Sequence, residues 1–128
     1  MPAPWFKGQV LGGNPRYSFH TVAGRVAVLF FMGSARDAAV KSALDVLLSS
    51  DRYEDSRVCL FTVTHDPDDV SSGRIASGQY GVRHFLDYDR AIGTTYGACR
   101  EGSNRYEAYI AVLDRQLRVA GRYPPSQA

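Results

Sequence analysis

Two cysteines are the residues of this 128-residue chain best suited to redox chemistry. Cys99 lies in the segment YGACREGSNRYE, where Arg100 and Arg105 are close enough in sequence to stabilise a thiolate. Cys59 lies in the apolar run RVCLFTV, which is typical of a buried cysteine. Their spacing fits neither a disulfide framework nor a metal site. Cys99, with Arg100 and Arg105, is therefore the candidate catalytic group, and an ordinary loop cysteine is the alternative.

A second candidate site follows the apolar start of the segment VAVLFFMGSARDAAVKSALDVLL, residues 26–48. Exposed backbone N–H groups before a helix, together with the Arg36 side chain, could bind an anion or small ligand. Ser34 and Asp37 also have the spacing of a capping box, which predicts Ser34 as the N-cap of a helix beginning near Ala35. In that alternative Asp37 itself occupies the anion position. The candidate ligand-binding residues are Ser34, Arg36 and Asp37.

Histidines and carboxylates could in principle form a metal centre. His20, His65 and His84 would have to meet Asp66 or Asp87 around an ion. An iron site of two histidines and one carboxylate, however, calls for a His-x-Asp motif with a distant histidine, and the sequence contains no His-x-Asp. We therefore predict surface or strand-end histidines, no metal site and no cofactor.

The composition is that of one soluble globular domain, with 45% hydrophobic and 22% charged residues. The net charge is only +2 and the arginines form no stripe, which argues against a nucleic-acid partner. No apolar run approaches the roughly 20 residues that cross a membrane, and the N-terminal residues lack the pattern of a signal peptide. The expected location is the cytoplasm, without a membrane partner.

The elements that must position these residues are predicted from apolar patterning. The run RVAVLFF predicts a central strand over 25–31, and the helix after it shows apolar residues at helical spacing up to Leu48. RVCLFTVT predicts a second buried strand, and HDPDD predicts a mirrored helix start with Asp66 as N-cap and Pro67 at the first helical position. Two such units indicate βαβ crossovers and parallel neighbours in one sheet.

Three further elements complete the predicted sheet. VRHFLD predicts a short strand, and YDRAIGTTYG predicts a short helix with Asp89 near its start and Gly97 just past its end. EAYIAVLD and LRVAGRYP predict a hairpin around the polar break DRQ. The pair of prolines in the terminal residues PPSQA cannot continue a sheet, so we predict a domain over 1–123 and a tail or the start of a linker over 124–128.

The order of these elements resembles the thioredoxin superfamily and, within it, the peroxiredoxin-like domains of the alkyl hydroperoxide reductase/thiol-specific antioxidant branch. The resemblance runs from about residue 3 to 122 through APWF, TVAGRVAVLFF, FTVTHDPDD, FLDYDRAIGTTYGA and AYIAVLDRQLRV. It implies an α/β, thioredoxin-like fold with a central mixed β-sheet flanked by helices. The activity implied for such redoxin domains is that of a thiol-dependent oxidoreductase.

The residues of the family's active site have no counterparts in this sequence. The peroxidatic cysteine of the family stands in Pro-x-x-x-Thr/Ser-x-x-Cys after the first strand, where this chain has MGSARDAAVK and no cysteine. The two positions of a thioredoxin-type CxxC would fall near Arg36 and Ala39, and the family's arginine would fall near Ala108, three residues from Arg105. The resemblance therefore implies the fold of an enzyme that has lost its nucleophile.

Domains without the cysteine, with APWF and a similar NPRY segment, look like those at the N-terminal side of bacterial Fe(II)/2-oxoglutarate dioxygenases of the prolyl-hydroxylase type. The favoured interpretation is a redox-inactive interaction or accessory module. Its partner would be another protein or a covalently linked dioxygenase domain, and the domain could also form a homodimer. The alternative interpretation is a thiol-dependent peroxidase or oxidoreductase that uses the relocated Cys99.

Overall fold

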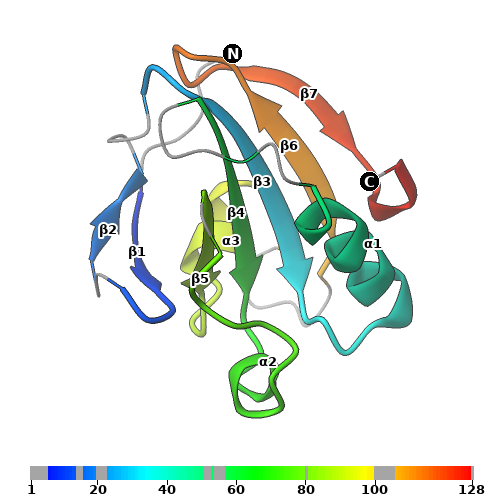
Figure 1. The fold of residues 1–128 in the computed structure, drawn as a ribbon. Helices are drawn as coiled ribbons and strands as arrows, with labels where there is room; N and C mark the ends of the chain where they lie inside the picture. The colour runs from blue at the N-terminus through cyan, green and yellow to red at the C-terminus, as the bar shows by residue number, and fades with distance from the viewer. Residues whose placement is uncertain are drawn as a thin grey trace.

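The computed structural model describes residues 6–13, 16–19, 23–50, 53, 57–79, 81–99 and 106–127. These residues form a seven-stranded mixed sheet in the order β2-β1-β5-β4-β3-β6-β7 (Figure 1). The strands are β1 Lys7–Val10, β2 Tyr17–Ser18, β3 Val26–Gly33, β4 Val58–Thr64, β5 Val82–Leu86, β6 Tyr109–Leu113 and β7 Val119–Tyr123. The helices are α1 Ala38–Leu48, α2 Asp68–Ser71 and α3 Ala91–Thr95, and a 3-10 turn, η2, covers Pro125–Gln127. The predicted α/β class with a central mixed sheet flanked by helices is confirmed.

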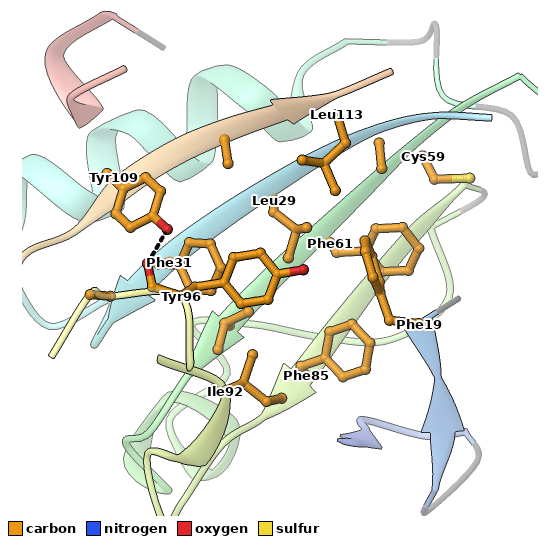
Figure 2. Packing of buried hydrophobic residues seen from close by; sticks show 14 of the residues in the cluster. Phe19, Leu29, Phe31, Cys59, Phe61, Phe85, Ile92, Tyr96, Tyr109 and Leu113 are labelled. Carbon is orange, nitrogen blue, oxygen red and sulfur yellow. Dashed lines mark hydrogen bonds between the residues drawn. The ribbon is translucent and has the colours of Figure 1, made fainter. Parts of the chain in front are cut away.

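Strand β3 is buried on both faces, because α1 lies on one face of the sheet and α3 on the other (Figure 1). Phe30 and Met32 pack with the apolar residues of α1. Leu29 and Phe31, which alternate with them along the strand, pack with the other cluster, which includes Ile92 of α3 (Figure 2). A strand covered on both faces reads as one continuous apolar run. This is why RVAVLFF could be predicted as a central strand.

Aromatic side chains dominate the core on the α3 face (Figure 2). Phe19, just after β2, stacks on Phe6 with ring centroids 4.8 Å apart and meets Phe61 of β4 edge to face at 5.4 Å. At the other end of this cluster the Tyr109 hydroxyl donates a hydrogen bond of 2.6 Å to the carbonyl oxygen of Tyr96. The ring contacts of Phe19 hold the β1–β2 hairpin on the sheet, and the hydrogen bond from Tyr109 ties the end of α3 to β6.

Helix α1 begins later than the sequence predicted. Asp37, not Ser34, is the N-cap, and its carboxylate accepts the N–H groups of the second and third helical residues at 2.9 and 3.3 Å. Ser34 instead donates its hydroxyl hydrogen to Asp66, 2.6 Å away in the neighbouring loop. The prediction of a helix starting near Ala35 is therefore wrong, because a contact between loops takes the side chain that was expected to cap the helix.

The second strand-to-helix unit is a much shortened copy of the first, since α2 has four residues and α1 has eleven. The prediction of Asp66 as N-cap and Pro67 at the first helical position is wrong by one residue, because Pro67 stands at the N-cap and α2 begins at Asp68. The Asp66 carboxylate still accepts the N–H of Asp68 at 3.0 Å. The prediction for the third helix is confirmed. Asp89 accepts the first N–H of α3 at 3.1 Å, and Gly97 follows the helix with a left-handed φ of +78°.

The chain leaves the sheet at Tyr123, the end of β7, and residues 125–127 form the 3-10 turn η2 beside α1 (Figure 1). The division into a domain over 1–123 and a tail or linker over 124–128 stays a prediction. Among the described residues no helix is long and apolar enough to span a membrane.

Candidate functional site

The candidate site lies where the carboxyl ends of β3, β4 and β5 meet. The three strands are parallel, and their pairing puts Gly33 beside Thr64 and Thr64 beside Leu86. The loops that leave these strands therefore emerge at the same edge of the sheet. In open α/β sheets this edge is where ligands bind.

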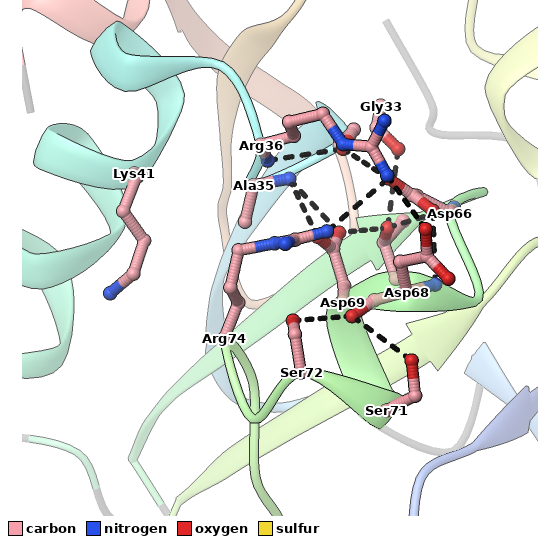
Figure 3. Close-up of polar contacts among 12 residues, drawn as sticks. Gly33, Ala35, Arg36, Lys41, Asp66, Asp68, Asp69, Ser71, Ser72 and Arg74 are labelled. Atoms are coloured by element: carbon pink, nitrogen blue, oxygen red, sulfur yellow. Dashed lines mark hydrogen bonds and ion pairs between the residues drawn. The ribbon is translucent and has the colours of Figure 1, made fainter.

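The carboxylate of Asp69 in α2 lies fully buried at this edge (Figure 3). It accepts the backbone N–H of Ala35 at 2.9 and 3.2 Å, the hydroxyl of Thr64 at 2.5 Å and Nε of Arg74 at 2.7 Å. A buried carboxylate is tolerated only when donors such as these replace water. Asp69 thus joins α2 to the loop after β3 and to the end of β4.

The predicted ligand-binding residues Ser34, Arg36 and Asp37 do lie at this edge, and each has a partner inside the protein. The hydrogen bond from Ser34 is the main reason why the pKa of Asp66 lies below its usual value. Arg36 is 66% exposed and reaches Asp68 at 2.7 Å, while Asp37 caps α1. These contacts leave the three side chains engaged with their own chain.

A hollow of about 420 Å³ lies beside this network, lined by Ser34, His65 and Tyr106 among others. The Tyr106 ring covers Gly33, which has a left-handed φ of +70° and where a Cβ atom would lie 2.7 Å from the ring. The ring centre of His65 is 5.2 Å from that of Tyr106. The pKa of His65 is lowered mainly by burial and to a smaller extent by the positive charge of Arg90. Tyr106 therefore occupies the space directly above the end of β3.

The hydroxyl of Tyr106 is buried and has no hydrogen-bond partner among the described residues. Burial raises the pKa of this hydroxyl far above its usual value. The far side of the same ring touches Gly93 of α3, and Cys99 lies next to that glycine. Tyr106 thus stands between the loop after β3 and the cysteine.

Cys99, the candidate catalytic residue, is 5% exposed. Its Sγ atom lies 3.4 Å from the Thr94 hydroxyl and 3.9 Å from the Arg90 carbonyl oxygen, and its backbone pairs with that of Tyr106. Arg100 and Arg105, the cations expected to activate it, lie outside the described residues. Cys59 is fully buried in β4, as predicted for a core residue.

His65 and His84, the two histidines that the structure describes, take part in no common metal site. His84 was predicted at the surface or at a strand end, and this is wrong, because it is 3% exposed within β5 with Nδ1 2.5 Å from the Thr62 hydroxyl. Burial lowers the pKa of His84. His65 lies just past the end of β4, and His20 is outside the described residues. In the described part of the chain no three His, Cys, Asp or Glu side chains gather in a way that could hold a metal ion.

Comparisons with known proteins identify the fold. No protein-family model and no curated protein sequence matches the chain. Among solved structures, a yeast mitochondrial 1-Cys peroxiredoxin matches with a TM-score of 0.76 and 13% identity, over 97% of this chain and 65% of that one. A Plasmodium vivax 2-Cys peroxiredoxin matches at 0.72 and 15%, over 96% and 82%. The pneumococcal lipoprotein thioredoxin Etrx1 matches at 0.69 and 16%, over 94% and 89%.

These likenesses establish a thioredoxin-like α/β fold, which the matched peroxiredoxins and thioredoxin share, and at such low identity they establish the fold alone. The chain spans 65% of the length of the yeast peroxiredoxin. The sequence had suggested Ser34, Arg36, Asp37 and Cys99 as site residues, and the first three lie together at the sheet edge. Asp69 and Tyr106, which fill that edge, were not singled out from the sequence.

Proposed function

We propose that this chain is a redox-inactive peroxiredoxin-like domain that works as an interaction or accessory module of an Fe(II)/2-oxoglutarate dioxygenase. The dioxygenase is either linked to it covalently or bound to it as a separate protein. The catalytic iron then belongs to the dioxygenase, since the sequence of this chain has no His-x-Asp motif.

The observation that carries the proposal is the state of the loop after β3. The segment from the end of β3 into α1, MGSARDAAVK, contains no cysteine. Thiol chemistry at a helix start depends on backbone N–H groups that stabilise the thiolate. Here the N–H of Ala35 is taken by Asp69, and the N–H groups of the second and third residues of α1 are taken by Asp37. Carboxylates of the chain itself thus occupy the donors that a thiolate would need.

The burial of Cys99 also favours an inactive domain. A peroxidatic thiol must meet peroxide in solution, and reactive cysteines lie in partly exposed, electropositive surroundings. At 5% exposure, beside the ring of Tyr106, Cys99 has the surroundings of a structural cysteine.

The redox part of the proposal is tested by the consumption of hydrogen peroxide and of an alkyl hydroperoxide with dithiothreitol as reductant. We expect the wild type, Cys99→Ser and Cys59→Ser to give the rate of the reductant alone. A wild-type rate above that background, lost in Cys99→Ser and kept in Cys59→Ser, would instead establish a thiol peroxidase that uses Cys99.

The accessory part is tested by gel filtration of this domain mixed with a prolyl-hydroxylase-type dioxygenase from the same source. We expect the two proteins to elute together and the domain alone to show no 2-oxoglutarate turnover with Fe(II). Separate elution, together with unchanged dioxygenase activity in the mixture, would contradict an accessory role.

A further inference from the structure

We infer that Ala35, Thr64 and Arg74 form a carboxylate-binding cradle and that Asp69 is its internal ligand, which keeps the cradle closed to free anions. This inference rests on the contacts of these four residues and not on the proposed function. The ligand class is a small monocarboxylate, of which formate is the simplest.

The cradle is built from donors alone. The Thr64 hydroxyl comes from the end of β4. Figure 3 shows the other two donors, the Ala35 N–H in the loop after β3 and the Arg74 guanidinium in the segment after α2. All three converge on one carboxylate that has no exposed surface. Hydrogen bonds to charged groups are about twice as strong as neutral ones. Three elements of the fold are thus organised around one negative charge.

Only one of the three donors carries a full charge. Nε of Arg74 is 2.7 Å from Asp69, and its Nη2 lies 3.4 Å from Asp66, whose carboxylate stays at the rim of the network with 16% of its side chain exposed. The arginine side chain itself is 23% exposed. An ion that replaces the Asp69 carboxylate would therefore keep one guanidinium partner and could enter along the exposed part of Arg74.

The site already holds a ligand in cis, because Asp69 is attached to the protein. The effective concentration of a rigidly positioned group in the same molecule is far above millimolar, so millimolar free anions do not displace the Asp69 carboxylate. Truncation of Asp69 to alanine removes a carboxylate group of the size of formate and leaves the three donors in place. The vacated cradle should then bind formate.

The experiment compares urea unfolding of wild type and Asp69→Ala in sodium formate and in sodium chloride of equal ionic strength. We expect formate to lower the unfolding equilibrium constant of Asp69→Ala along a saturable curve, about tenfold at a concentration ten times the dissociation constant. Wild type should respond equally to the two salts. If Asp69→Ala unfolds identically in formate and chloride, the cradle does not bind a carboxylate and the inference fails.

Two variants control for general salt effects. Asp114→Ala removes an exposed carboxylate that accepts the N–H groups of Gln116 and Arg118, and formate should not stabilise this variant more than chloride does. Asp69→Ala/Arg74→Gln lacks the cation of the cradle and should lose the formate response. An equal formate effect in either control would overturn the inference.

A third readout covers the case in which Asp69→Ala does not fold in chloride. Refolding from urea is then carried out in formate, and recovery of soluble, folded protein in formate alone supports the cradle. Failure to refold in both salts overturns the inference, because the bound anion would have had no stabilising effect.

Discussion

Replacement of Gly33 by alanine tests whether the Tyr106 ring closes the end of β3. The new Cβ atom would lie 3.0 Å from Cγ of Tyr106 and 2.7 Å from its Cδ1, and the second distance is shorter than real Cβ contacts. Gly33 also has a φ of +70°, a conformation that an L-residue adopts only with strain. Gly33→Ala should therefore destabilise the protein through a steric clash as well as through the backbone.

The two contributions can be separated by magnitude. The left-handed conformation costs about 1 kcal/mol for alanine, and forcing a methyl group into a packed site costs about 2 kcal/mol. Gly33→Ala should thus lower the free energy of unfolding by about 3 kcal/mol. Gly73 is the matched control, since its φ is +77° and a Cβ there meets no atom within 4 Å among the described residues. Gly73→Ala should cost about 1 kcal/mol.

Urea unfolding of Gly33→Ala, Tyr106→Ala and the double variant completes the test as a double-mutant cycle. Without the ring the clash disappears, so the double variant should be more stable than the sum of the single changes by about 2 kcal/mol. The reasoning is refuted if Gly33→Ala costs no more than Gly73→Ala, or if the two changes at Gly33 and Tyr106 are additive.

Three more predictions concern the same fold. Burial lowers the pKa of His84, so the protein has its full stability above the unfolded pKa of about 6.5 and loses stability as pH falls from there towards the folded pKa, by up to about 1.4 kcal/mol per pH unit. Urea unfolding measured against pH should show a shallower loss of stability in His84→Gln than in wild type. Equal pH profiles for the two proteins would contradict this. Asp37→Ala should lower the free energy of unfolding by about 1 kcal/mol through loss of the α1 cap, measured by the same assay, and no change would show that the cap is dispensable. Tyr106→Phe should be neutral or stabilising by up to about 1 kcal/mol, because it removes a buried hydroxyl that has no partner among the described residues; a clear loss of stability would reveal a partner.

The central strands could be predicted because strands buried on both faces consist of consecutive apolar residues. Strands β3 and β4 read as apolar runs, and the hairpin of β6 and β7 follows a polar break. Strand β1 was missed, since its four residues KGQV bury only the last side chain and carry no apolar run. Its place in the sheet is decided by pairing with β5, nearly eighty residues away, which local patterning does not report.

The candidate site was only half predictable for the same reason. Ser34, Arg36 and Asp37 could be found from their position between a strand and a helix. Asp69 looked like one of two acids in a helix first turn, and its actual role depends on the loop after β3, 34 positions earlier in the chain. A usable signal was present, since parallel neighbours bring consecutive loops together at one edge. Asp69 could then have been paired with Ala35.

The wrong prediction for His84 has a cause in the local sequence. His84 follows Arg83 in the short strand VRHFL, where two adjacent polar residues break the alternation that would show which side chains face the core. In the structure its ring is covered, with Nδ1 against the Thr62 hydroxyl of the neighbouring strand. His84 thus finds its hydrogen-bond partner on the neighbouring strand and not in water. That partner can be identified only once the pairing of β4 with β5 is known.

The most direct test of the account is a single-turnover oxidation without any reductant. The native reduced protein is mixed with one equivalent of hydrogen peroxide, quenched with a sulfenic-acid trap within seconds, and analysed by intact mass and peptide mapping. We predict unmodified protein, because neither buried thiol meets the oxidant and the loop after β3 has no cysteine. Stoichiometric trapping of a sulfenic acid at Cys99 on that timescale would contradict the account.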